Sequence, residues 1–242
     1  MTSGPVPGPA SPFTDDGQLP SGDEKATAVR SMFDAIAPRY DMVNRIMTFR
    51  LDVGWRRRSV RSLALAPGST ILDLACGTGD LCRELSRSGF VPVGADLSFG
   101  MLAAARTDAP LLHADALRLP LPDGCVDGVT CGFALRNFVD LDRFLAEVAR
   151  VVRPGGRIAL LEVAEPPNPV LRWGHALYFG KVVPRIGGLL SDRDAYRYLP
   201  RSVAYLPEPP ALVQAVVDAG FPDADRRLLS GGIAQLLTGT RA

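Results

Sequence analysis

The chain has 242 residues, of which 47% are hydrophobic and 22% are charged, and its formal net charge is +1. This composition is typical of one globular domain with a full core, and the near-neutral charge predicts no general attraction to nucleic acid or to an anionic surface. Four cysteines without a C-x-x-C pair and only two histidines predict neither a metal site nor a disulfide framework.

The N-terminal part of the chain divides into a tail and a helical segment. Residues 1–24 are rich in Pro, Gly, Ser and Asp, a composition that predicts a disordered tail. We expect residues 25–242 to form one domain. It starts with apolar residues at helical spacing over about 29–65, which predict a helical lid, and Pro38 is expected to end its first helix.

Short apolar runs then alternate with helical patterns. We expect strands at residues 70–75, 91–95, 111–113, 126–131 and 157–163. We expect helices at residues 81–89, 101–106, 141–152 and 212–219. This alternation predicts an α/β fold, a mainly parallel sheet with helices on both faces. It is interrupted at about 166–205 by an insertion on the substrate side, and residues 224–238 predict a terminal hairpin.

A glycine loop follows the first predicted strand, in the segment 72–80. Gly77 and Gly79 allow a tight turn and a close approach of the backbone to a ligand. The N–H groups at the start of the next helix can hold a carboxylate. Asp73, before the loop, suits an amino group better than a phosphate, so we expect a ligand that carries an amino acid moiety.

Acidic residues at the next two strand ends extend this candidate site. Asp96 ends the second strand at the spacing where a carboxylate meets the two hydroxyls of a ribose. Asp115 and Ala116 follow the third strand, where an adenine amine would be read. The competing ligand is NAD, but a dinucleotide motif prefers Gly or Ala where Cys82 stands. We therefore expect S-adenosylmethionine as the cofactor.

Several further motifs occur in the order in which one known family has them: residues 33–41, Asn44, 55–57, 133–137, 154–156, 194–199 and 231–233. From about residue 29 the chain resembles the ubiquinone/menaquinone biosynthesis C-methyltransferases. This resemblance implies a class I Rossmann-like fold with a seven-stranded sheet and an antiparallel terminal strand. It also implies methylation of a ring carbon of a polyprenylated quinol, with demethylmenaquinol converted to menaquinol.

The resemblance also places the family's cofactor contacts on residues of this chain: Thr78, Asp96, Asp115 and Ala116, with Gly132 where the family has a serine. Further departures fall in the predicted substrate half, among them Arg201 and Gln235. They leave two alternatives open. One is C- or O-methylation of another phenolic or polyketide ring, and the other is a subunit that binds S-adenosylmethionine without catalysis.

Arg136 is the main catalytic candidate. A hydroquinone carbon becomes nucleophilic when its hydroxyl loses a proton, and the resemblance implies that Arg136 acts on that hydroxyl. Because a free Arg is almost never deprotonated, we expect it to stabilise the phenolate; the alternative is a structural Arg paired with a carboxylate.

Three further residues are assigned to the same reaction. Asn137 is expected to orient the hydroxyl, Tyr40 to bound the transfer chamber, and Asp41 to orient a water or Arg136. Their alternatives are a turn or cap residue, lid packing and a helix cap. No role is predicted for His113 or His175.

The stretch 170–190 combines aromatic and aliphatic residues with Arg172, Lys181 and Arg185. It has three interpretations: a tunnel for a prenyl tail, a surface that rests on a membrane, or a buried lid helix. No run is long enough to span a bilayer, so we expect a cytoplasmic protein, with peripheral contact at the inner face of the membrane as an option. The sequence does not decide between a monomer and a homodimer.

Overall fold

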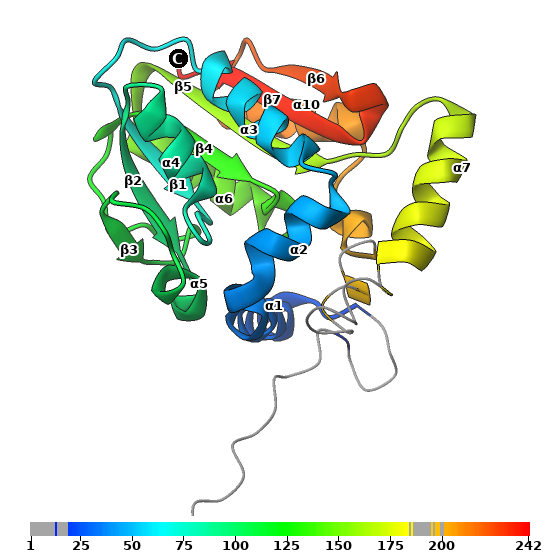
Figure 1. Cartoon of the computed structure of the whole chain (residues 1–242). Helices are drawn as coiled ribbons and strands as arrows, with labels where there is room; N and C mark the ends of the chain where they lie inside the picture. The colour runs from blue at the N-terminus through cyan, green and yellow to red at the C-terminus, as the bar shows by residue number, and fades with distance from the viewer. Residues whose placement is uncertain (1–12, 14–18, 184, 186–194, 196, 199–200) are drawn as a thin grey trace, which may run out of the picture.

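A seven-stranded sheet forms the centre of the computed structural model (Figure 1), which describes residues 13, 19–183, 185, 195, 197–198 and 201–242. The strands follow the order β3-β2-β1-β4-β5-β7-β6. Their bounds are β1 Thr70–Leu74, β2 Val91–Asp96, β3 Leu111–His113, β4 Val126–Gly132, β5 Val152–Val163, β6 Asp225–Leu229 and β7 Ala234–Thr240.

The pairing of these strands confirms the predicted mainly parallel sheet. β1 pairs in parallel with β2 and β4, β2 with β3, and β4 with β5. Only β7 is antiparallel, and it is inserted between β5 and β6. β5 begins at Val152, before the predicted start at residue 157, because Val152 already pairs with Val126 across an irregular register.

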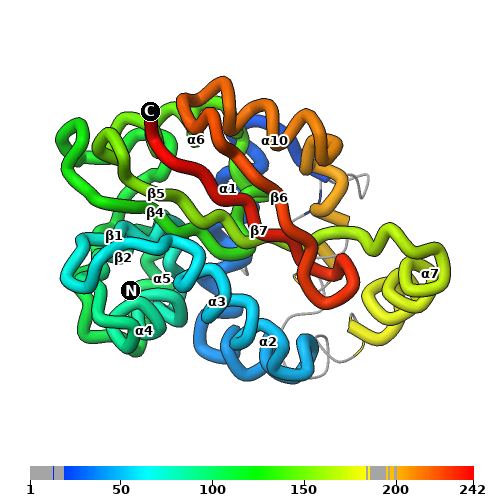
Figure 2. The backbone as a smooth tube through the Cα atoms, turned by 90° about the horizontal axis from the view of Figure 1, so that it is seen from above, coloured from blue at the N-terminus to red at the C-terminus, as the bar shows by residue number. Residues whose placement is uncertain are grey.

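Helices cover both faces of the sheet, as the alternation of side chains along each strand requires. Leu72 and Leu74 of β1 belong to one apolar cluster with α6 (Leu141–Val151) and α10 (Pro209–Asp218). Ile71, which precedes Leu72 and points to the other face, belongs to a second cluster with α3 (Leu51–Ser62) and α4 (Asp80–Arg87). Figure 2 shows these two pairs of helices on opposite sides of the strands. Both faces of β1 are therefore buried, which explains its almost continuous apolar sequence.

The predicted N-terminal lid consists of α1 (Gly22–Ile36), a 3-10 turn (Ala37–Arg39), α2 (Tyr40–Met47) and α3. Pro38 lies in the turn directly after α1, as predicted. Met32 and Ile36 of α1 pack in a third apolar cluster with Met101 of α5 (Phe99–Ala103).

The start of α1 differs from the predicted end of the N-terminal tail. α1 begins inside the segment 1–24, because Gly22, Asp23 and Glu24 are already helical. For residues 1–12 and 14–18 the prediction of disorder lies outside the described residues.

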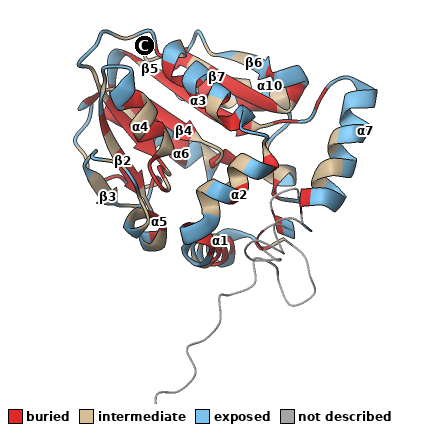
Figure 3. Cartoon of the chain, in the orientation of Figure 1, coloured by how far each residue is buried: buried red, intermediate tan, exposed pale blue. Residues whose placement is uncertain are grey.

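The insertion between β5 and α10 contains α7 (Pro169–Leu177), a π-helical turn labelled η3 (Tyr178–Val182) and a 3-10 turn labelled η4 (Ser202–Tyr205). α7 lies apart from the sheet and is mostly exposed (Figure 3). None of its residues is buried, so the interpretation of this stretch as a buried lid helix is wrong for α7. The family-like motif 194–199 lies partly outside the described residues. Among the described segments, none forms a helix both long and apolar enough to cross a membrane.

Candidate active site

The glycine loop joins β1 to α4 at the carboxyl end of the strand. Gly77 and Gly79 have φ values of 56° and 81°, which an L-amino acid with a side chain rarely adopts. A Cβ on Gly79 would also lie 2.7 Å from Cγ2 of Thr107. Gly79 is therefore required by its conformation and by close packing against the segment after α5.

A cavity of about 340 Å³ opens beside this loop, where the strand order reverses between β1 and β4. Ligands of open α/β sheets bind at such a switch point, outside the carboxyl ends of the strands. Of the predicted residues, its lining includes Gly77, Asp96, Asp115, Ala116, Gly132, Tyr40 and Asn137. Sequence reasoning missed the apolar contributors from α1 and α5, chiefly Phe33 and Met101. We call this space the first cavity.

Asp96 is held in place at the wall of the first cavity by backbone donors. The N–H of Gly77 donates to Oδ2 of Asp96 at 2.7 Å, and the N–H of Ser98 donates to Oδ1 at 2.8 Å. Burial raises the pKa of Asp96, while these two N–H groups lower it. At the next strand end, Oδ1 of Asp115 accepts from the N–H of Leu117 at 2.9 Å. The two carboxylates are thus preorganised in adjacent loops.

Three residues of the predicted cofactor set lie next to the first cavity rather than in its lining: Asp73, Thr78 and Gly79. Asp73 is 1% exposed and accepts from Oγ1 of Thr130 at 2.8 Å. Burial raises the pKa of Asp73 from 3.8 to about 7. Thr78 donates its hydroxyl to Asp41. In this structure Asp73 lies in β1 before the glycine loop, and Thr78 and Gly79 are part of the loop itself.

A second cavity of about 290 Å³ lies on the other side of Tyr40 and Phe133, which line both cavities. Its walls come from α2, α3, the end of β5, α7 and η3, and include Met47, Trp55, Arg136, Arg172, His175 and Phe179. The second cavity is therefore mainly apolar, with a few charged groups at its wall.

The shared wall is built from two aromatic rings. Tyr40 is half-buried and packs against Phe33 with ring centroids 5.9 Å apart, and desolvation raises the pKa of its phenol. Phe133 has a φ of 62° and lies against Trp55 with centroids 6.1 Å apart. A positive φ in an aromatic residue is unusual and costs free energy, and such strain clusters at functional sites.

Arg136 follows β4 in the 3-10 turn η2 (Leu135–Asn137) and is 5% exposed. Its Nη1 pairs with the fully buried carboxylate of Glu162 and donates to the carbonyl of Phe133 at 2.8 Å. Its Nε donates to Oγ of Ser202 at 3.0 Å. The alternative of an Arg paired with a carboxylate is thus observed. Arg136 nevertheless lines the second cavity, and its Nη2 makes no hydrogen bond with a described residue.

Glu162 was missed by sequence reasoning, although a signal exists. It is the only charged residue in the segment from Ile158 to Val163, the apolar second half of β5. A carboxylate in such a strand requires a buried partner.

The other two catalytic candidates, Asn137 and Asp41, do not line the second cavity as Arg136 does. Asn137 lines the first cavity, and its Oδ1 accepts from the hydroxyl of Tyr198 at 3.3 Å. Asp41 accepts from Thr78 and lies 3.8 Å from Nη2 of Arg83. The contacts of the Asp41 carboxylate with described residues thus lie on the side of the glycine loop, and its role in orienting a water or Arg136 stays a prediction.

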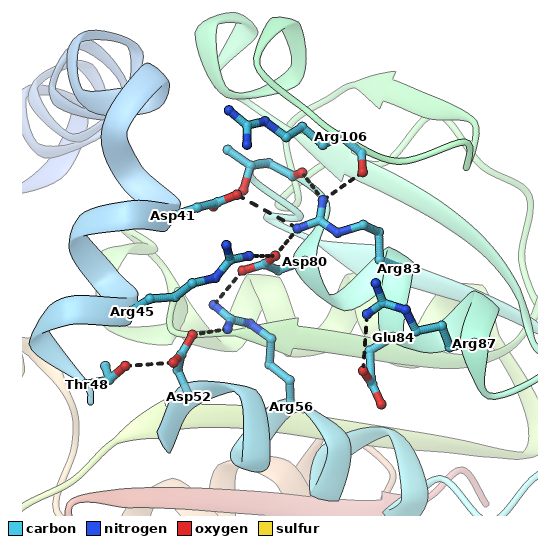
Figure 4. Close-up of polar contacts among 11 residues, drawn as sticks. Asp41, Arg45, Thr48, Asp52, Arg56, Asp80, Arg83, Glu84, Arg87 and Arg106 are labelled. Carbon is cyan, nitrogen blue, oxygen red and sulfur yellow. Dashed lines mark hydrogen bonds and ion pairs between the residues drawn. The ribbon is translucent and has the colours of Figure 1, made fainter. Parts of the chain in front are cut away.

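A network of charged side chains ties the lid to α4 (Figure 4). Asp80 at the start of α4 receives Arg45 from α2 at 3.2 Å, Arg56 from α3 at 3.4 Å, and Arg83 from its own helix. Arg56 also pairs with Asp52. One carboxylate thus links α2 and α3 to the helix that starts at the glycine loop.

Solved structures with the same fold define the class. An S-adenosylmethionine-dependent methyltransferase of Thermotoga maritima matches with a TM-score of 0.62 and 17% identity, over 87% of this chain and 99% of that one. The [4+2]-cyclase SpnF matches with a TM-score of 0.63 and 16% identity, over 92% and 96% of the two chains. The fold is therefore that of the class I methyltransferases.

Sequence comparison identifies the family within this class. Residues 21–241 match the model of the ubiE/COQ5 methyltransferase family. The demethylmenaquinone methyltransferase of Thermus thermophilus is 46% identical, over 87% of this chain and all of that one. The enzyme of the same name from Deinococcus radiodurans is 41% identical, over 95% of this chain and all of that one. The chain belongs to the ubiE/COQ5 methyltransferase family and is an S-adenosylmethionine-dependent methyltransferase.

Proposed function

We propose that this protein transfers a methyl group from S-adenosylmethionine to a ring carbon of demethylmenaquinol and so forms menaquinol. The names of the relatives from Thermus thermophilus and Deinococcus radiodurans support this acceptor. The observation that carries the proposal is the pair of cavities that meet at Tyr40 and Phe133. One has acidic groups at successive strand ends, and the other is apolar with an Arg at its wall.

The residues of the first cavity fit the cofactor. Asp96 presents a carboxylate for the ribose hydroxyls, Asp115 and Ala116 lie where the adenine is expected, and Gly77 offers a loop without a side chain for the methionine part. When bound, S-adenosylmethionine supplies an activated methyl group. The side chains of Phe33 and Met101 add apolar surface to the same cavity, which favours the exclusion of water when the cofactor is bound.

The residues of the second cavity fit an aromatic acceptor. Its apolar walls suit a naphthoquinol ring, and Arg136 supplies a fixed positive charge for the phenolate that develops on the ring oxygen. Glu162 holds the guanidinium in one orientation and leaves Nη2 free of the described residues. Tyr40, between the cavities, bounds the space through which the methyl group passes.

We further propose that α7 and the turn at residues 48–50, directly after α2, rest on the inner face of the cytoplasmic membrane, where a prenylated quinol would be found. Val170, Trp173 and Phe49 are 75%, 71% and 72% exposed. The rings of Phe49 and Tyr178 lie 5.6 Å apart, which brings the two segments together. Exposed apolar residues beside basic ones such as Arg172 and Lys181 are typical of interfacial helices.

The test of the acceptor is incubation of the purified protein with labelled S-adenosylmethionine and a panel of reduced quinols. Mass spectrometry should show one added methyl group on the ring carbon of demethylmenaquinol. A methyl ether instead would support the O-methylation alternative. Binding of S-adenosylhomocysteine without any methylated product would support the subunit without catalysis.

A further inference from the structure

One residue that lines the second cavity carries a polar atom that the reaction described so far does not use. Nε2 of His175, on α7, is buried and makes no hydrogen bond with any described residue. The imidazole ring lies against Phe179 with centroids 4.3 Å apart and lines the same cavity as Arg136. A buried polar atom without a partner is costly, and because His175 lines a cavity for a ligand, a bound ligand can supply the missing partner.

The charged surroundings decide which protonation state His175 holds. The titratable groups that line the same cavity in the described part of the chain are Tyr40, Asp52, Arg56, Arg136, Glu165 and Arg172. Asp52 is paired with Arg56, which leaves Glu165 as the carboxylate that acts on the imidazole. Burial lowers the pKa of His175 below its ordinary value of 6.5, while Glu165 raises it. At neutral pH the ring is therefore neutral, and a neutral imidazole carries one nitrogen that accepts a proton.

We propose that His175 is the general base that accepts the hydroxyl proton of the quinol, while Arg136 stabilises the resulting phenolate. This inference rests on the proposed function, because it needs a phenolic acceptor in the second cavity. It separates two roles that one Arg cannot fill, since a guanidinium stabilises negative charge but does not accept a proton.

The protons and electron pairs balance without another reactant. The quinol O–H bond breaks, its proton goes to Nε2 of His175, and the electron pair stays on the oxygen. The ring carbon forms a bond to the methyl group as the methyl–sulfur bond breaks, and the sulfur keeps that electron pair. The ring carbon then loses its own hydrogen as a proton to water, which restores the aromatic ring as a phenolate. The imidazolium returns its proton to the phenolate oxygen, so the net release is one proton.

The test compares His175→Gln with His113→Gln, since the chain has only these two histidines. His113 is exposed and lies outside the lining of both cavities. For His175→Gln we expect kcat at pH 7 to fall by about 10²- to 10⁴-fold, the range typical of a lost general base. The affinity for S-adenosylhomocysteine and the melting temperature should change little, and His113→Gln should behave as the wild type.

The pH dependence of kcat distinguishes a general base from a residue with a purely structural role. In the wild type, kcat should fall as the pH drops through the lowered pKa of His175, because the base becomes protonated. In His175→Gln this acidic limb should disappear, and the rate should instead rise towards the pH at which the phenol ionises by itself, at about 10.

A second readout does not depend on turnover. In spectra of isotope-labelled histidine, the resonance missing from His175→Gln identifies His175 in the wild type. Demethylmenaquinol added together with S-adenosylhomocysteine should shift this resonance and its titration, and should leave that of His113 in place.

Two outcomes would overturn the inference. The first would leave the proposed function intact, and the second would overturn the proposed function as well. A wild type that methylates the quinol, with a His175→Gln variant that keeps its kcat within about twofold and retains the acidic limb, overturns the role of His175 alone. A wild type that methylates no quinol overturns the proposed function, and this inference with it.

Discussion

The carboxylate of Glu162 holds the guanidinium of Arg136 and also the backbone next to it. Glu162, on β5, is fully buried and pairs with Nη1 of Arg136. Its Oε2 accepts from the backbone N–H of Arg136 at 3.2 Å, and its Oε1 from that of Val163 at 2.8 Å. One side chain from the neighbouring strand therefore positions the turn after β4 and the charge at the second cavity.

We expect Glu162→Gln to destabilise the protein and to impair turnover. The variant leaves the buried guanidinium without a counter-charge, and breaking a buried ion pair costs about 3–5 kcal/mol. Denaturant unfolding should show a loss at the lower end of this range, because the amide keeps one acceptor. Since the first cavity is untouched, kcat should fall while the affinity for S-adenosylhomocysteine stays the same. The matched control is Glu147→Gln, whose partner Arg150 is partly exposed to solvent, and it should cost less than Glu162→Gln, about 1 kcal/mol.

Replacement of Asp96 should weaken cofactor binding. Asp96→Ala removes the carboxylate proposed to accept both ribose hydroxyls, and we expect a loss of about 1–3 kcal/mol in the affinity for S-adenosylhomocysteine, measured by calorimetry. Asp96→Asn keeps one acceptor and should lose less. Asp108→Ala, an exposed residue outside the cavity lining, serves as control. Unchanged affinity in Asp96→Ala would remove this residue from the cofactor site.

Asp73 should make folding stability depend on pH. Its pKa is raised from 3.8 to about 7, mainly by burial, so the folded state favours the protonated carboxyl. Its contribution to stability is therefore fully present below pH 3.8 and is lost as the pH rises to about 7. The amide in Asp73→Asn does not titrate, so its contribution to stability does not change with pH.

Relative to the wild type, the free energy of unfolding of Asp73→Asn should therefore rise as the pH increases from 3.8 to about 7, by at most about 1.4 kcal/mol per pH unit. Denaturant unfolding of both proteins at a series of pH values measures this difference. Above pH 7 to 8 it should be constant, which provides an internal control. A difference that does not change between pH 4 and 7 would contradict the raised pKa.

Asp80 should hold the N-terminal lid in its ordered position. Asp80→Ala removes the common partner of Arg45, Arg56 and Arg83 and should cost about 1–3 kcal/mol, the scale for hydrogen bonds to charged groups. Amide hydrogen exchange should become faster in α2, and cofactor affinity should fall because Tyr40 lines the first cavity. Glu84→Ala, one turn further along α4, removes ion pairs with the exposed Arg57 and Arg87 and should leave α2 protected. Unaltered exchange in Asp80→Ala would show that the lid is held by apolar packing alone.

Much of the fold and part of the site could be predicted from the sequence because they depend on local patterns. Apolar runs and helical spacing placed the strands and helices within a few residues. The glycine loop and the acidic residues Asp96 and Asp115 follow strand ends, and parallel strands bring such ends to one edge of the sheet. These residues therefore lie in one cavity for topological reasons alone.

The sequence by itself determined the order of the elements, the edge of the sheet that carries the site and the class of its ligand, because backbone geometry and strand topology act over short stretches of chain. Only the tertiary structure decided that Tyr40 and Phe133 divide two cavities, that Glu162 holds Arg136, and that His175 lines the same cavity as that Arg. These contacts join segments far apart in the chain, and their geometry is set by how the lid and the insertion pack onto the sheet, which no local pattern records.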